Sequence, residues 1–74
     1  MSQVRMLDVR GLEAPEPLER VLDALSTLPP GDILRMQIDR EPQPLYRILE
    51  RNGYRFQAQA HEDGLYDILI QHGA

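Results

Sequence analysis

The sequence predicts an α+β fold, a two-layer α/β sandwich in which both helices cover one face of a four-stranded mixed sheet. The apolar residues follow strand and helix periodicities in the order β-α-β-α-β-β. Right-handed crossovers place both helices on the same face. The chain has 74 residues, of which 42% are hydrophobic, so it is one domain with enough apolar side chains for a core. We expect a single domain over residues 1–74, ordered from about residue 4 to residue 71.

The first half of the chain predicts a strand, a helix and a turn. Residues 4–9 alternate, with Leu7 and Val9 on one side, and Gly11 ends this strand. A helix is expected over about residues 15–28, because its apolar residues recur at helical spacing. They are Leu18, Val21, Leu22, Leu25 and Leu28. The prolines at its start fit the first turn, where backbone N–H groups lack partners, and the Pro-Pro-Gly sequence at 29–31 ends it.

The second half predicts a strand, a shorter helix and a hairpin. Residues 33–39 alternate as a half-buried strand, and a helix follows over about 42–52 with Leu45, Ile48 and Leu49 on its buried side. Asn52 and Gly53 are suited to its C-terminal cap. Strands over 54–60 and 66–70 are joined by a turn at 62–64, and residues 71–74 are expected to fray.

One face of this sheet is left uncovered by helices. It is expected to carry Arg35, Arg55, Gln57, Gln59, Asp67 and Leu69. Such a face is either solvated or a partner surface. Because Leu65 and Leu69 share it, we expect a monomer or a weak homodimer.

Composition excludes several classes of function. There is no cysteine, which excludes disulfides, thiolate metal sites and cysteine nucleophiles. The chain has twelve acidic residues against eight arginines, a net charge of −4, with no basic cluster, so we expect no nucleic-acid binding. No apolar run is long enough for a membrane span, and no signal pattern is present at the N-terminus, so we expect a cytoplasmic protein.

The two strand-to-helix passages resemble each other. Residues 15–22 and 42–49 share the pattern Pro-x-Pro-Leu-x-Arg-(Val or Ile)-Leu. The repeat records either a duplicated βα unit or two similar ways of starting a helix after a strand. In both cases the two helices begin at the same sheet edge, outside the carboxyl ends of two strands, where α/β proteins commonly bind ligands.

Charged residues converge on this edge. They are Asp8, Arg10, Glu13, Glu16, Asp39, Arg40 and Glu41. One interpretation is structural, with each aspartate pairing an arginine to order the edge. The other is a charged recognition surface for a partner or ligand. Phosphate binding is disfavoured, because acidic residues occupy the helix starts and no glycine-rich loop is present.

The opening of the chain resembles the TusA/SirA sulfur-carrier family. Residues 7–12 read Leu-Asp-Val-Arg-Gly-Leu and residues 14–17 read Ala-Pro-Glu-Pro. The family has Leu-Asp-x-Arg-Gly followed by Cys-Pro-x-Pro. The sequence at 40–45, Arg-Glu-Pro-Gln-Pro-Leu, is similar to a sister group of short uncharacterised bacterial proteins, domain of unknown function 2249.

The resemblance implies the fold and a presentation edge that docks onto other proteins. It also implies that Ala14 stands where the family has its sulfur-carrying cysteine, which argues against sulfur transfer by this chain. For the sister group it implies a link to redox or nitrogen-oxide metabolism. These implications favour a non-catalytic accessory module that docks onto or regulates another protein through the edge. The alternative is a sensor that binds a small ligand or a metal at the same edge.

Catalysis, metals and cofactors have little support in the residues themselves. His61 beside Glu62 and Asp63 is a conceivable metal ligand, but such a residue is more often a polar strand end. His72 lies in the expected frayed tail, and no serine or threonine has a nearby histidine. We therefore expect no catalytic residues, no bound metal and no cofactor.

Overall fold

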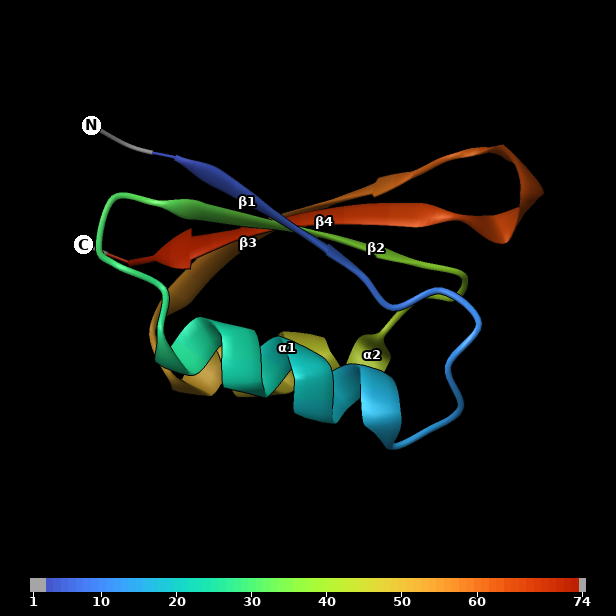
Figure 1. Ribbon diagram of the computed structural model, residues 1–74, viewed down its shortest axis with the longest axis horizontal. Coiled ribbons are helices and arrows are strands. Elements are labelled where there is room, and N and C mark those ends of the chain that lie inside the picture. The colour runs from blue at the N-terminus through green and yellow to red at the C-terminus, as the bar shows by residue number, and fades with distance from the viewer. Residues whose placement is uncertain (1–2, 74) are drawn as a thin grey trace.

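The computed structural model describes residues 3–73, and its elements follow the predicted order (Figure 1). The elements are β1 (Val4–Asp8), α1 (Glu16–Ser26), β2 (Ile33–Ile38), α2 (Gln43–Arg51), β3 (Tyr54–Ala60), a 3-10 turn η1 (Glu62–Gly64) and β4 (Tyr66–His72). Each differs from its expected bounds by no more than a few residues at either end. No helix among residues 3–73 is long and apolar enough to cross a membrane.

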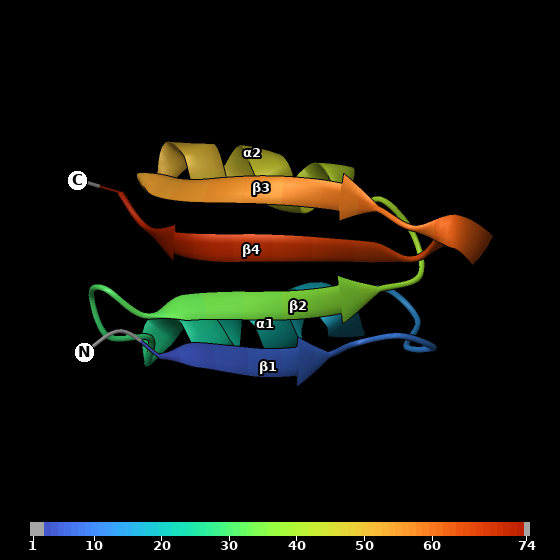
Figure 2. The same ribbon diagram turned by 90° about the horizontal axis from the view of Figure 1, so that it is seen from above.

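The four strands form one mixed sheet with the order β1-β2-β4-β3 (Figure 2). Strands β1 and β2 are parallel, whereas β4 is antiparallel to both of its neighbours, β2 and β3. Figure 1 shows α1 and α2 side by side beneath the same face of the sheet. This arrangement confirms the predicted α+β fold.

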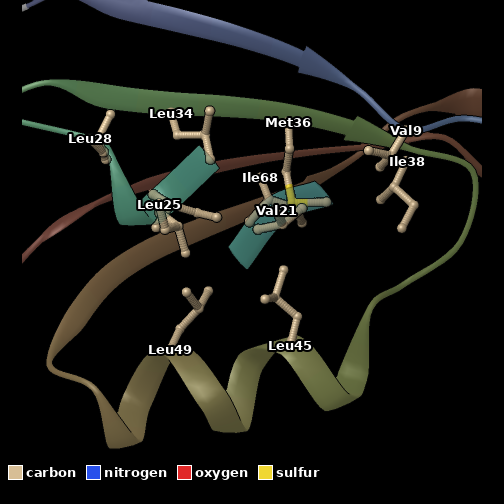
Figure 3. Close-up of a cluster of buried hydrophobic side chains, with 11 residues drawn as sticks. Val9, Val21, Leu25, Leu28, Leu34, Met36, Ile38, Leu45, Leu49 and Ile68 are labelled. Atoms are coloured by element: carbon tan, nitrogen blue, oxygen red, sulfur yellow. The ribbon is translucent and has the colours of Figure 1, made fainter. Parts of the chain in front are cut away.

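The core lies between the helices and the sheet (Figure 3). Helix α1 contributes Val21 and Leu25, and α2 contributes Leu45 and Leu49. The remaining buried apolar residues are Val9, Leu28, Leu34, Met36, Ile38, Ile68 and Ile70. The alternation in β2 and β4 and the helical spacing therefore place most of the core as predicted. Leu22 is an exception, since its position at the margin of the α1 stripe leaves it exposed.

Both helices begin and end where the sequence indicates. Each has a proline in its first turn, where the missing N–H group is not needed. Asn52 caps the C-terminus of α2, and Gly53 follows with a φ of 76°, a left-handed conformation that glycine adopts without steric cost.

The prediction that residues 71–74 fray is wrong for residues 71–73. Strand β4 runs through His72, whose Nε2 lies 2.8 Å from the carbonyl oxygen of Leu28. The His72 ring packs on Tyr54 with 5.0 Å between centroids, and the Gly73 N–H group donates to the Gly53 carbonyl at 2.8 Å. These tertiary contacts hold the end of the strand. Ala74 lies outside the described residues.

The sheet face away from the helices, called here the open face, carries the expected polar residues, but one of them is buried. Asp67 is only 7% exposed, because Arg35 and His61 both contact its Oδ2, at 2.9 and 2.8 Å. The Arg35 hydrogen bond holds the pKa of Asp67 below its ordinary value, with His61 contributing. The outer part of this face is apolar at β1, where Val4 and Met6 are 58% and 59% exposed.

Candidate functional site

The two repeated proline segments meet at one end of the sheet, and an apolar groove lies between them. Figure 1 shows the starts of α1 and α2 at the same end of the molecule. The cavity between them has a volume of about 330 Å³. This hollow is called here the Pro-x-Pro groove.

Both copies of the sequence pattern line the Pro-x-Pro groove with the same positions. The Pro-x-Pro-Leu residues are Pro15, Pro17 and Leu18 in the first copy and Pro42, Pro44 and Leu45 in the second. Ala14 precedes the first copy, and its side chain is exposed at the groove. The lining is completed by Val21, Met36, Ile38, Arg40 and Glu41.

The floor of the groove is part of the hydrophobic core. Val21, Met36, Ile38 and Leu45 are all buried, and Figure 3 shows Leu45 pointing from α2 toward Val21 and Met36. Each pattern places its leucine three residues after its first proline, on the side of the helix that faces the sheet. The groove thus lies directly over the core between the two helix starts, and the four core residues beneath it are at most 2% exposed.

Asp39 and Arg40 hold the loop between β1 and α1. The Gly11 N–H group donates to Asp39 Oδ2 at 3.0 Å, and this bond lowers the pKa of Asp39. Gly11 has a φ of 80°, which a larger residue would adopt only with strain. Arg40 Nη2 donates to the Leu12 carbonyl at 3.0 Å, and Arg40 Nε lies 3.6 Å from Asp39 Oδ1. The segment before α2 therefore positions the segment before α1.

Asp8 and Arg10 form an exposed pair of their own. Arg10 donates to both oxygens of Asp8 from Nε and Nη2, at 2.8 Å each, and its backbone N–H group adds a third bond at 3.0 Å. These bonds, the side-chain ones first, lower the pKa of Asp8 to about 2. The pair orders the end of β1.

The three glutamates of the edge are differently placed. Glu41 accepts a hydrogen bond from Gln43 Nε2 at 2.6 Å. Glu13 and Glu16 form no ion pair or side-chain hydrogen bond within residues 3–73. The structural interpretation of the edge therefore accounts for four of the seven charged residues, namely Asp8, Arg10, Asp39 and Arg40. Glu16 lies in the first turn of α1, where a carboxylate is favourable, but neither it nor Glu13 is paired with another side chain within residues 3–73.

The groove offers a mostly apolar surface, with Arg40 and Glu41 as its charged residues. Glu41 is the one carboxylate in this lining, and residues 3–73 contain no cluster of three or more potential metal ligands. His61 contacts Asp67 on the open face and is not part of the groove lining. With no cysteine in the chain, Ala14 offers only a methyl group.

Sequence reasoning identified the charged edge but not the groove. The signal was present in the repeated pattern, because a leucine at the same position of two adjacent helix starts implies a shared apolar surface. Sequence reasoning also missed the contacts around Asp67. Their signal was the cross-strand register, which places Asp67 opposite Gln37 and Gln59 and two register pairs from Arg35, on the same face of the sheet.

Comparisons with known proteins agree with this architecture. The sequence model of the family described as "Uncharacterized conserved protein (DUF2249)" matches residues 6–72. No curated protein matches the sequence. Among solved structures, a SirA-like protein from Desulfitobacterium hafniense is similar, with a TM-score of 0.80 and 23% sequence identity over 100% of both chains. At this level of identity the likeness concerns the fold.

Proposed function

Because the chain belongs to the DUF2249 family of uncharacterised conserved proteins and has the SirA-like fold, we propose that it is a non-catalytic docking module. It binds or regulates another protein through the Pro-x-Pro groove and the charged edge around it. That edge comprises Asp8, Arg10, Glu13, Glu16, Asp39, Arg40 and Glu41.

One observation carries this proposal. All six proline and leucine positions of the repeated Pro-x-Pro-Leu pattern line a single groove at one end of the molecule. A surface hollow of apolar side chains rimmed by charged residues is typical of a protein interaction site. The pattern therefore serves a shared surface as well as two helix starts.

The position of Ala14 supports a role without catalysis. Ala14 is exposed at the groove, at the position where the resemblance to the sulfur carriers places their cysteine. A methyl side chain has no lone pair with which to accept or transfer sulfur. A presentation surface without its reactive atom can still bind a protein.

The proposal also includes the cellular location, the oligomeric state and the class of partner. We place the module in the cytoplasm, as a monomer or weak homodimer, with a protein partner and no nucleic acid. The family resemblance links that partner to redox or nitrogen-oxide metabolism.

A pull-down from a lysate of the source cells tests the docking surface. Glu16→Arg reverses an unpaired charge of the edge, and Ala14→Phe fills the groove entrance. Glu50→Arg is the matched control, because Glu50 is exposed near the C-terminal end of α2, away from the groove. We expect a specific set of proteins to be lost with the first two variants and retained with the control. Equal recovery by all folded variants would refute the docking surface.

The alternative is a small-ligand or metal sensor at the same edge. The apolar lining and the volume of about 330 Å³ favour a small apolar ligand over a metal ion. A thermal-shift screen separates the two functions, because a specific ligand raises the melting temperature in proportion to the logarithm of its concentration. A concentration-dependent rise that Ala14→Phe abolishes would favour the sensor.

A further inference from the structure

The lining of the Pro-x-Pro groove is mostly apolar. Its floor consists of buried core side chains, including Met36 and Leu45, its walls are mainly prolines and leucines, and Arg40 and Glu41 are its two charged residues. A polar group placed against the apolar part of this lining would lose its water without gaining a hydrogen-bond partner, which is costly. The volume of about 330 Å³ lies at the lower end of ligand pockets, which suits one large side chain more than a long segment.

The rim of the groove is acidic. The charged residues that line or directly flank the groove are Glu13, Glu16, Arg40 and Glu41, three carboxylates against one guanidinium, and that guanidinium already contacts Asp39. Glu13 and Glu16 alternate with residues that line the groove and make no ion pair within residues 3–73. The charge facing an incoming partner is thus negative.

Glu16 also affects whether the start of α1 attracts a negatively or a positively charged partner. The N-terminus of a helix favours anions, but here the first turn of α1 already contains Glu16 and Glu19. An acidic partner would meet these carboxylates, whereas a cationic partner would pair with them. Charge complementarity therefore selects a basic partner.

We propose that the occupant of the groove is a protein segment with one large apolar side chain flanked by lysine or arginine. This inference rests on the proposed docking function and specifies the chemistry of the partner. The apolar side chain contacts Leu18 and Leu45, and the flanking cations pair with Glu13 and Glu16.

Three capped synthetic pentapeptides test the two parts of this inference. In the first peptide the central residue is leucine and its two neighbours are arginine. In the second the central leucine has two glutamate neighbours, and in the third the central residue is serine with two arginine neighbours. Each is titrated into the isotope-labelled protein, and binding is followed by the methyl signals of Leu18 and Leu45. We expect the arginine–leucine peptide to bind about five-fold or more tighter than the glutamate–leucine peptide, a difference that two weak surface ion pairs supply. The serine peptide should leave the methyl signals unmoved.

Charge variants identify the residues responsible. Glu16→Arg should remove the preference for the arginine–leucine peptide, Glu16→Gln should reduce it, and Glu50→Arg should leave it unchanged. High salt should weaken the preference, because exposed ion pairs are screened.

Each contrary result overturns a defined part of the inference. Equal affinity for the two leucine peptides refutes the basic partner. Equal effects of the leucine and serine peptides, or no movement of the methyl signals at millimolar peptide, refute the apolar anchor. The pull-down tests the docking function separately from the peptides. If the partner is not basic and apolar, the peptides fail to bind as expected, but Ala14→Phe still abolishes capture of the partner in the pull-down.

Discussion

Replacing Leu45 by alanine tests whether the Pro-x-Pro groove is open to solvent. Leu45 is 2% exposed and lines the groove, whereas Leu49, one helical turn later on α2, is 0% exposed and lies outside the groove lining. The two residues thus have the same type of side chain, lie on the same helix and are buried to a similar degree. They differ in whether the space left by truncation joins an existing opening.

The expected loss of stability follows from this difference. Leu→Ala removes three carbons, which corresponds to about 2.4 kcal/mol of lost transfer free energy. At an enclosed site, the remaining cavity adds up to about 2 kcal/mol. We therefore expect Leu49→Ala to lower the free energy of unfolding by about 3–4 kcal/mol. Leu45→Ala should lower it by about 2–3 kcal/mol, because solvent can enter the enlarged groove.

Urea denaturation followed by circular dichroism measures both values. The free energy of unfolding of a domain of 74 residues is roughly 4–11 kcal/mol, so Leu49→Ala removes a large part of it. An osmolyte at the same concentration in all samples stabilises the folded state enough to give a native baseline for this variant. A loss for Leu45→Ala equal to or greater than that for Leu49→Ala would show that the groove is closed in solution, and the argument for an apolar anchor site would fail.

Three further predictions concern the loop, the open face and the groove entrance. Asp39→Ala removes the acceptor of the Gly11 N–H group, so hydrogen exchange of that amide should accelerate and stability should fall by about 1 kcal/mol, whereas Asp8→Ala should leave this exchange rate unchanged. The pKa of Asp67 is lower in the folded state than in the unfolded state, where it is about 3.9. Ionised Asp67 therefore stabilises the fold at a pH above the unfolded pKa. This stabilisation is lost as the pH falls through the folded pKa. Urea denaturation should therefore show that Asp67→Asn is less stable near neutral pH but loses less stability than wild type on acidification from about pH 5 to pH 2. A thiol introduced by Ala14→Cys should react with an aromatic disulfide reagent in the folded protein at the rate of a free thiol; slow reaction would contradict its exposure.

The fold was predictable because its elements carry local signals. The alternation in β2 and the spacing of Val21 and Leu25 in α1 follow directly from the periods of the two structures. The end of β4 was not predictable in the same way. Residues 71–73 are held by contacts with Leu28, Gly53 and Tyr54, which are distant in sequence. The local sequence of residues 71–73 gives no signal of these contacts.

The location of the candidate site could be predicted from the topology, but the contacts of its residues could not. Parallel strands bring the two helix starts together, so the charged residues around Asp39 could be assigned to one edge from the topology alone. Which of them bind one another depends on side-chain distances. Asp39 and Arg40 hold the Gly11–Leu12 loop, an assignment that required the coordinates. The groove could not be predicted, because the space between the two helix starts depends on how the helices pack, which the sequence pattern does not give.

The order of the strands in the sheet differs from their order along the chain, and this affects synthesis. Strand β4 is the last of the four strands to be made but lies between β2 and β3, so these two strands become parts of one sheet only when residues 66–72 have been added. In a nascent chain that ends before residue 66, β1 and β2 can pair, whereas β3 lacks its partner strand β4. The apolar faces of the sheet are therefore completed only when β4 has been made, and a stop before residue 66 leaves them exposed to other molecules in the cell.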